Sequence, residues 1–268
     1  MISYPQILPY FLKIGPLELR WYGLAYAVGV FGGIWAITPG LKQRLGLTLD
    51  QISSLPIYLM LGIVLGGRFG YILFYDLPYY LRYPSEVLAL WHGGMSFHGG
   101  CLGSLAALWI FARVHRTRVW GVVDAICAGA PLGIFLGRMA NFINGELFGR
   151  VTTLPWAMIF PNGGPLPRHP SQLYEALLEG LVLGLVVYPL YRRGQLRDGQ
   201  VSALFVGLYG LFRFGIEFFR EPDQQVGFLA LGLSLGQWLC LAMIAIGLGI
   251  WAWSLQAKTS TETGSLPR

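Results

Sequence analysis

The sequence predicts an all-α integral membrane protein, a polytopic bundle of about seven membrane-spanning helices with a small outward-facing loop region. Of its 268 residues, 54% are hydrophobic and 12% are charged, whereas a typical soluble domain has about 25% charged residues. The apolar residues fall in blocks of about 20, the length that an α-helix needs to cross the hydrocarbon core of a bilayer. Lipid is therefore the expected solvent for most of the chain.

These blocks predict spans over residues 20–38, 55–75, 96–114, 121–142, 173–191, 200–219 and 230–254. They make up one expected transmembrane domain, residues 1–255, followed by a polar, disordered cytoplasmic tail over residues 256–268. The first residues have no basic region ahead of an apolar run, so we expect no removed signal peptide. Four glycines at helical spacing in the second span predict close packing against another helix: Gly62, Gly66, Gly67 and Gly70.

The basic residues predict the orientation of the bundle, because Lys and Arg are enriched in cytoplasmic loops. They are densest after the first, third and fifth spans: Lys42 and Arg44, then Arg113, Arg116 and Arg118, then Arg192, Arg193 and Arg197. We therefore expect the N-terminus outside and the C-terminus in the cytoplasm. The net charge of +6 follows this asymmetry and does not by itself imply a nucleic-acid partner.

The three cysteines, Cys101, Cys127 and Cys240, lie far apart within apolar stretches. They form neither a metal-binding spacing nor a Cys-x-x-Cys pair, so we interpret them as packing residues and predict no metal site.

Three arginines, Arg68, Arg138 and Arg213, fall inside predicted spans, where each costs about 2.5–3.5 kcal/mol even on the lenient insertion scale. Two interpretations are open. Each arginine could lie near a span end or pair with a carboxylate, for which Asp124, Glu175 and Glu217 are the candidates. Alternatively, the arginines could bind an anion, and Arg220 adds a further cation on the helix face of Arg213 and Glu217.

The segment GRMANFINGELFGR combines Arg138 and Asn141 on one helix face with a break at Gly145 and polar residues beyond it, including Asn144 and Glu146. Amide donors and acceptors at similar depth are not needed for packing alone. They indicate a polar site where a helix meets the outward loops.

In HGGMSFHGG, His98 lies between two glycine pairs, a composition that predicts a broken helix or a re-entrant turn. A single histidine is commonly a packing residue, but this one is also a candidate general base.

In RHPSQLYEALLEG, Pro170, Ser171 as N-cap, Glu175 and Glu179 are typical of a helix start. Arg168, His169 and Glu175 remain as modest site candidates.

Four segments, GGMSFHGG, GRMANFINGELFGR, RHPSQLYEALLEG and FRFGIEFFREPD, resemble in order and spacing the bacterial prolipoprotein diacylglyceryl transferases. Residues Gly137 to Gly149 fit the signature G-R-x-x-N-F-x-N-x-E-x-x-G of that family. The stretch from Val151 to Pro167 is shorter than the outward arm of some members, which leaves peptide contacts there open. By position, the resemblance associates the following residues with function: Tyr22, His98, Arg138, Asn141, Glu146, Gly149, Arg213 and Glu217.

The resemblance implies an enzyme of the bacterial inner membrane that moves the diacylglyceryl group of phosphatidylglycerol to the lipobox cysteine of a prolipoprotein. No cofactor is implied. In this hypothesis Arg138 and Arg213 hold the lipid phosphate, with Asn141, Glu146, Gly149 and Arg220 beside them. Glu217 orients one guanidinium, and His98 accepts the thiol proton. The nucleophile belongs to the substrate, so none of the three cysteines needs a catalytic environment.

Two other classes compete with this interpretation. Intramembrane arginines also occur in transporters and channels for anions, although no internal repeat of the kind that builds many transporters is evident. An intramembrane hydrolase is disfavoured because no G-x-S-x-G motif is present.

Overall fold

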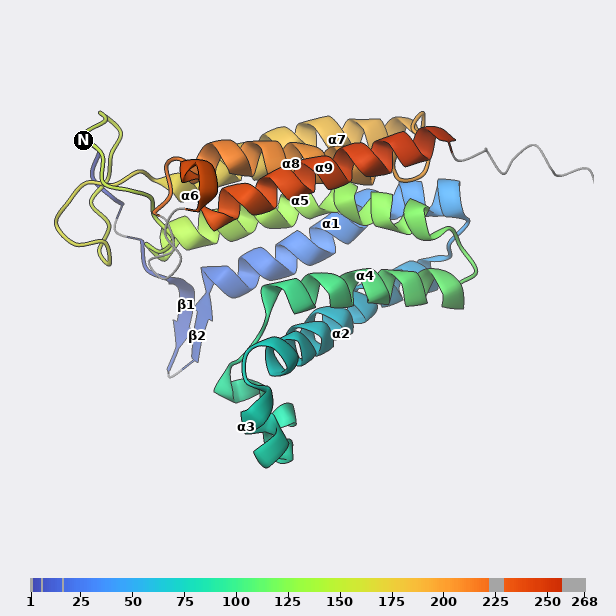
Figure 1. The fold of residues 1–268 in the computed structure, drawn as a ribbon, viewed down its shortest axis with the longest axis horizontal. Coiled ribbons are helices and arrows are strands. Elements are labelled where there is room, and N and C mark those ends of the chain that lie inside the picture. Colours follow the sequence, from blue (N-terminus) through green and yellow to red (C-terminus); the bar gives the residue numbers. More distant parts are fainter. Residues whose placement is uncertain (1, 6, 16, 222–228, 257–268) are drawn as a thin grey trace, which may run out of the picture. The chain divides into compact units, whose positions relative to one another are not determined.

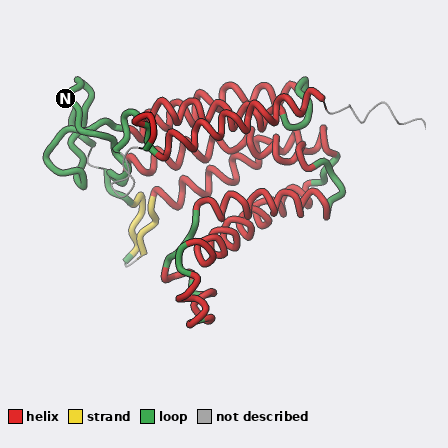
Figure 2. Tube along the Cα trace, in the orientation of Figure 1, coloured by secondary structure: helices red, strands yellow, loops and turns green. Residues whose placement is uncertain are grey.

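A computed structural model describes residues 2–5, 7–15, 17–221 and 229–256. It divides into two compact units, one formed by residues 1–37 and 124–268 and the other by residues 38–123. Each unit is described by itself. Helices dominate both, and Figure 2 shows that the strands are confined to one short hairpin near the N-terminus.

The first unit begins with an antiparallel hairpin, β1 (Tyr10–Ile14) and β2 (Leu17–Arg20), which the sequence analysis did not predict. Its strands are short, with Gly15 at a φ of 57° in the turn, a backbone conformation that glycine adopts without strain. The unit then contains the start of α1 (Trp21–Leu45), most of α5 (Val119–Ile143), α6 (Ser171–Glu175), η3 (Ala176–Val182), α7 (Leu183–Arg193), α8 (Gln200–Glu217), η4 (Ala230–Gly232) and α9 (Leu235–Gln256). In Figure 1, α8 and α9 lie side by side.

The second unit contains α2 (Leu49–Phe74), α3 (Leu77–Arg82), η1 (Pro84–Leu88), η2 (Leu90–His92) and α4 (Phe97–Val114). The glycines of α2 fit against those of α4. A Cβ atom on Gly66 would lie 2.4 Å from the carbonyl oxygen of Gly99, and one on Gly62 would lie 2.5 Å from that of Gly103. Only glycine permits this approach of the two backbones, which confirms the packing role predicted from the spacing.

The polytopic helical architecture is confirmed. Six helices among the described residues are long and apolar enough to cross a membrane. The remaining predicted span, the sixth along the chain at residues 200–219, corresponds to α8, an 18-residue helix that carries Arg213 and Glu217. The predicted tail falls almost entirely outside the described residues.

Arg68 does not pair with any of the carboxylates that the sequence suggested. Instead, its guanidinium donates to the backbone carbonyls of Val87 at 2.9 Å, Ala89 at 3.1 Å and Gly94 at 3.2 Å, and also to those of Glu86 and Gly93. The side chain therefore fastens the connection between α2 and α4, and the anion-binding interpretation does not apply to it.

Asp124 also has a structural role. Gly199, at the N-cap of α8, has no side chain to cap the helix. Asp124 of α5 replaces that cap: it is fully buried and accepts from the backbone amides of Gly199 and Ser202, both at 2.8 Å, and from the Ser202 hydroxyl at 2.5 Å. This one carboxylate satisfies three donors and joins α5 to α8. Its negative charge is also favourable at this place, because helix N-termini carry a partial positive charge.

We expect Asp124→Asn to destabilise the protein by about 2–3 kcal/mol, because its amide nitrogen would face a backbone donor that then stays buried and unpaired. Thermal unfolding in detergent would measure the loss. Ser202→Ala, which removes one donor and strands none, should lower the unfolding temperature less. Equal unfolding temperatures for the wild type and Asp124→Asn would contradict the capping role.

The connections after α5, before α6 and after α8 form a small ladder of extended segments. The backbone amide of Gly149 donates to His169, that of Arg150 to Phe219 and that of Met158 to Arg168, at 2.9, 2.9 and 3.0 Å. Isolated bridges pair Gly149 with Arg220 and Met158 with both Arg168 and Ile2. The ladder therefore joins the segments that follow α5 and α8 to the segment that precedes α6.

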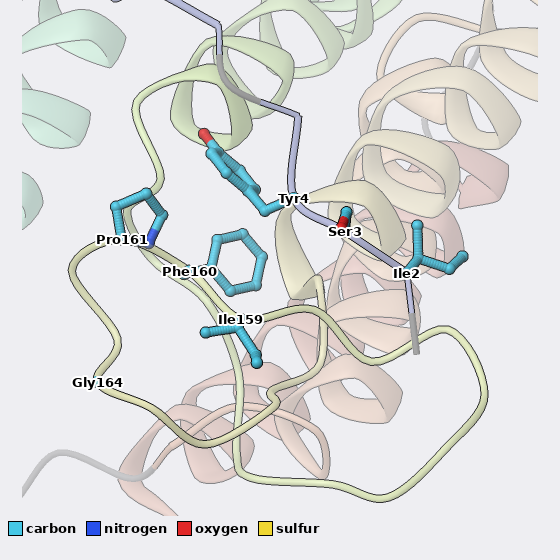
Figure 3. Close-up of a pocket in the computed structure, with 7 residues that line it drawn as sticks. All are labelled: Ile2, Ser3, Tyr4, Ile159, Phe160, Pro161 and Gly164. Carbon is cyan, nitrogen blue, oxygen red and sulfur yellow. The ribbon is translucent and has the colours of Figure 1, made fainter.

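The N-terminal segment packs on this ladder beside an open cleft of about 530 Å³. In Figure 3 the ring of Tyr4 lies next to that of Phe160, and their centroids are 5.1 Å apart. The Tyr4 hydroxyl donates to the carbonyls of Phe142 and Ile143 at 2.7 and 2.9 Å, which caps the end of α5. Among the described residues that line this cleft, Tyr4 alone has a titratable side chain, so we place the functional site elsewhere. The lining residues are Ile2, Ser3, Tyr4, Ile159, Phe160, Pro161 and Gly164.

Candidate active site

Three arginines from different parts of the first unit converge on one carboxylate, Glu175, at the end of α6. Arg138 of α5 places Nε 2.7 Å from its Oε2 atom. Arg213 of α8 and Arg220, just beyond α8, each place Nη1 near its Oε1 atom, at 3.1 and 2.6 Å. Glu175 is fully buried, whereas the three arginine side chains are 19–22% exposed. The cluster is therefore anchored on a buried carboxylate, and part of each arginine side chain remains accessible.

Two further carboxylates complete what we call the arginine cluster. Glu217 lies one turn after Arg213 on α8, with Oε2 3.2 Å from Nε of Arg213 and 3.9 Å from Nε of Arg220. Glu179 lies 3.6 Å from Nη1 of Arg213 and 3.7 Å from Nη2 of Arg138. The carboxylate interpretation of the intramembrane arginines therefore holds for Arg138 and Arg213. It does not exclude an anion, because the side chains of Arg138, Arg213 and Arg220 remain 19–22% exposed.

The loop after α5 carries the second polar group of the site. Asn141 and Asn144 both donate to Oε1 of Glu146, at 2.9 and 3.2 Å. Gln172 donates to the Glu146 carbonyl at 2.5 Å. The next residue, Leu147, has a φ of 57°, a conformation that costs a non-glycine residue about 1–3 kcal/mol and that clusters at functional sites.

Ser171 does not cap α6 as the sequence suggested. Its hydroxyl donates to the Leu147 carbonyl at 3.0 Å, and the N-cap position falls on Pro170, which makes no side-chain capping bond. Ser171 thus holds the Leu147 turn against the helix that carries Glu175.

Gly149 is placed by packing. A Cβ atom there would lie 2.2 Å from the Phe219 carbonyl oxygen and 2.9 Å from Cβ of His169. Since residue 149 is bridged to Arg220, the missing side chain lets the backbone that carries this arginine approach the loop after α5.

We expect Gly149→Ala to destabilise the protein by about 1–3 kcal/mol through overpacking and to lower activity by displacing Arg220. Gly249→Ala in α9 is the matched control, because a Cβ atom there has no neighbour within 4 Å among the described residues. Thermal unfolding and the transfer assay described below would measure both effects. Unchanged stability and turnover in Gly149→Ala would show that the ladder tolerates the extra atom.

Tyr22, the aromatic candidate in α1, has its hydroxyl 3.2 Å from that of Tyr26, one turn later. Tyr26 in turn interacts electrostatically with Arg138 and Glu146. Tyr22 therefore connects to the site through Tyr26, which the sequence analysis did not single out although it shares the helix face.

His98 belongs to the second unit, whereas the residues of the arginine cluster belong to the first. The expected helix break lies before His98 and not on both sides of it. Gly93 and Gly94 adopt a φ of 79°, Ser96 caps α4, and His98 is exposed in the first helical turn. Gly99 and Gly100 continue the helix, so the break lies at the first glycine pair alone.

The modest candidates Arg168 and His169 have structural surroundings. Arg168 donates to the carbonyls of Gly163 and Gly149 at 3.0 and 3.2 Å and pairs with Glu221 at 2.7 Å. His169 stacks edge-on against Phe219, with Nδ1 3.2 Å from the Tyr174 hydroxyl. Burial lowers the pKa of His169, which favours a neutral ring in the ladder.

Glu179 was not predicted as a member of the cluster, because a glutamate early in a helix is ordinarily explained by the helix start. Tyr209, which interacts with Glu179 and Arg213, was not predicted either. The available signal was spacing, since Tyr209, Arg213 and Glu217 follow one another at intervals of four residues. Within the described residues, no three His, Cys, Asp or Glu side chains are grouped as metal ligands.

Fold and site together define a polytopic integral membrane protein that presents partly exposed arginines on buried carboxylates, an arrangement suited to an anionic group. The family model for prolipoprotein diacylglyceryl transferase matches residues 9–253. A phosphatidylglycerol–prolipoprotein diacylglyceryl transferase of Nitratidesulfovibrio vulgaris (strain Miyazaki F) is 52% identical over 91% of this chain and 92% of its own. Proteins of the same name from Rhodospirillum rubrum and Pseudomonas aeruginosa (strain LESB58) are 51% and 47% identical. The chain belongs to the prolipoprotein diacylglyceryl transferase family and is a transferase.

Proposed function

We propose that this protein transfers the diacylglyceryl group of phosphatidylglycerol to the thiol of a prolipoprotein lipobox cysteine. A sulfur–carbon bond forms at the glyceryl carbon, the carbon–oxygen bond to phosphate breaks, and glycerol phosphate leaves with the bonding electrons. Family membership and the names of the relatives support this reaction. The observation that carries it is the convergence of Arg138, Arg213 and Arg220 on buried Glu175, because the leaving phosphate needs fixed cationic donors.

In this proposal Arg138 and Arg213 hold the lipid phosphate, while Glu217 orients Arg213 through the 3.2 Å contact with its Nε atom. Arg220 adds a third guanidinium, and Asn141 with Glu146 lines the adjoining loop. Gly149 contributes by placing Arg220 through the backbone. Only the N–H groups that do not face Glu175 or Glu217 are available to the phosphate.

His98 is proposed to accept the thiol proton, directly or through water, because its side chain is exposed and a neutral imidazole has one nitrogen that can accept a proton. Tyr22 is proposed to act beside Arg138 through Tyr26. We further propose one catalytic domain in the bacterial cytoplasmic membrane, with the N-terminus outside and the C-terminus in the cytoplasm, as the basic loops favour.

The test is to incubate the purified protein with phosphatidylglycerol and a synthetic lipobox peptide and to weigh the peptide by mass spectrometry. A diacylglyceryl mass gain on this peptide, absent from a Cys-to-Ser peptide, is the expected result. If folded protein gives no gain but moves labelled anionic lipid between vesicle leaflets, the transporter interpretation replaces the transferase.

A further inference from the structure

Glu179 is a buried carboxylate to which the proposed phosphate contacts assign no role. It lies in η3, a π-helical segment that directly follows α6 and Glu175. Its side chain is fully buried, and its oxygens lie near the guanidiniums of Arg138 and Arg213. The Tyr209 hydroxyl also interacts with it. A carboxylate in a membrane span is costly, so its presence indicates a function.

The two carboxylates on this segment contact the same arginines in different ways. Glu175 lies 2.6–3.1 Å from the three guanidiniums, close enough to fix their orientation. Glu179 lies 3.6 and 3.7 Å from Arg213 and Arg138, too far for a strong hydrogen bond but close enough for a large electrostatic effect. Glu179 therefore supplies negative charge to the pair without determining its geometry.

The fold holds Glu179 at this distance. A Cβ atom on the next residue, Gly180, would lie 2.6 Å from Cβ and 2.7 Å from Cα of Phe135 in α5. The backbone of η3 thus packs directly on α5, three residues before Arg138. The widened π-helical turn, a feature frequent at functional sites, keeps Glu175 and Glu179 both directed at the arginines.

Formal charges in the cluster balance, with Arg138, Arg213 and Arg220 against Glu175, Glu179 and Glu217. A phosphate monoester carries more negative charge than the phosphodiester from which it forms. Without an opposing charge, the arginine pair would hold this product more tightly than the substrate and delay the next turnover.

We propose that Glu179 is a positioning residue that acts through its charge and not through its geometry. Its fixed negative charge weakens the binding of phosphate by Arg138 and Arg213 and so speeds the release of glycerol phosphate. The inference rests on the proposed function. Its structural basis is that Glu175 lies close to the guanidiniums of Arg138 and Arg213, whereas Glu179 lies farther from the same two groups.

The experiment measures glycerol phosphate binding to the detergent-solubilised protein by calorimetry, together with its inhibition of the transfer reaction. Glu179→Gln should bind glycerol phosphate about tenfold more tightly, the effect expected for one charge a few ångströms from the anion. Its turnover should fall while its KM for phosphatidylglycerol does not rise. Glu179→Asp keeps the charge and should stay within about threefold of the wild-type affinity.

Glu18→Gln, an exposed change in β2 that pairs only with Lys13 and Arg20 among the described residues, is the matched control. Glu179→Met serves if the glutamine variant does not fold, because methionine removes the charge with an unbranched side chain that fills an irregular space in a buried site. Unchanged or weaker glycerol phosphate binding in the folded neutral variant, or equal tightening in Glu179→Asp, would overturn the proposal. Failure of the proposed function is separate, since it would appear as absence of lipid transfer by the wild type.

Discussion

Replacing either Arg138 or Arg213 with lysine is expected to lower the rate of diacylglyceryl transfer by about 100-fold. Arg138 uses Nε to contact Glu175, and Arg213 uses Nε and Nη1 to contact Glu217 and Glu175. A planar guanidinium can keep these contacts and still direct a further N–H at phosphate. A lysine ammonium is a single point charge. It must therefore lose either the carboxylate contact or the phosphate contact, although its charge is the same as that of arginine.

Mass spectrometry of the lipobox peptide over time would give the rate, with thermal unfolding to confirm that each variant is folded. Arg113→Lys is the matched control, because Arg113 lies at the end of α4 over the ring of Trp109, outside the arginine cluster. Wild-type rates in both cluster variants would remove Arg138 and Arg213 from phosphate binding and leave their carboxylate contacts as purely structural.

Much of the architecture could be predicted because lipid imposes a simple rule. A span must be apolar over about 20 residues, so α4 and α5 were found within two residues of their ends, whereas α2 begins six residues before the predicted span. The hairpin Tyr10–Arg20 was not found, because each of its strands has too few residues for a clear period-two pattern. Likewise, Gly99 and Gly100 were interpreted as part of a helix break, whereas both lie within α4, where Gly99 allows a close contact with α2.

The polar site was predictable where its partners are close in sequence. Arg213 and Glu217 are four residues apart, so helical spacing alone placed them together. Partners far apart in the chain left no such signal: Arg138 contacts Glu175 only because α5 and α6 meet in the fold. The partners of Arg68 could not be predicted from the sequence, because they are backbone carbonyls, which every residue has.

The same convergence makes Glu175→Gln the second most damaging change. An amide at this position can accept from one arginine but presents its own N–H groups to another, so at least one guanidinium loses its partner. Breaking a buried ion pair from one side costs about 3–5 kcal/mol. We expect a loss of stability of that order, a rise in KM for phosphatidylglycerol, and a fall in turnover of about 100-fold.

Kinetics and thermal unfolding of three variants would separate geometry from stability. Glu221→Gln is the surface control: Glu221 also pairs with an arginine, Arg168 at 2.7 Å, but its side chain is 50% exposed, and exposed pairs contribute about 0–1 kcal/mol. Glu175→Asp keeps the charge on a shorter stem and should recover stability more than turnover. A folded Glu175→Gln variant with wild-type KM and turnover would show that the arginines keep their productive orientation without this carboxylate.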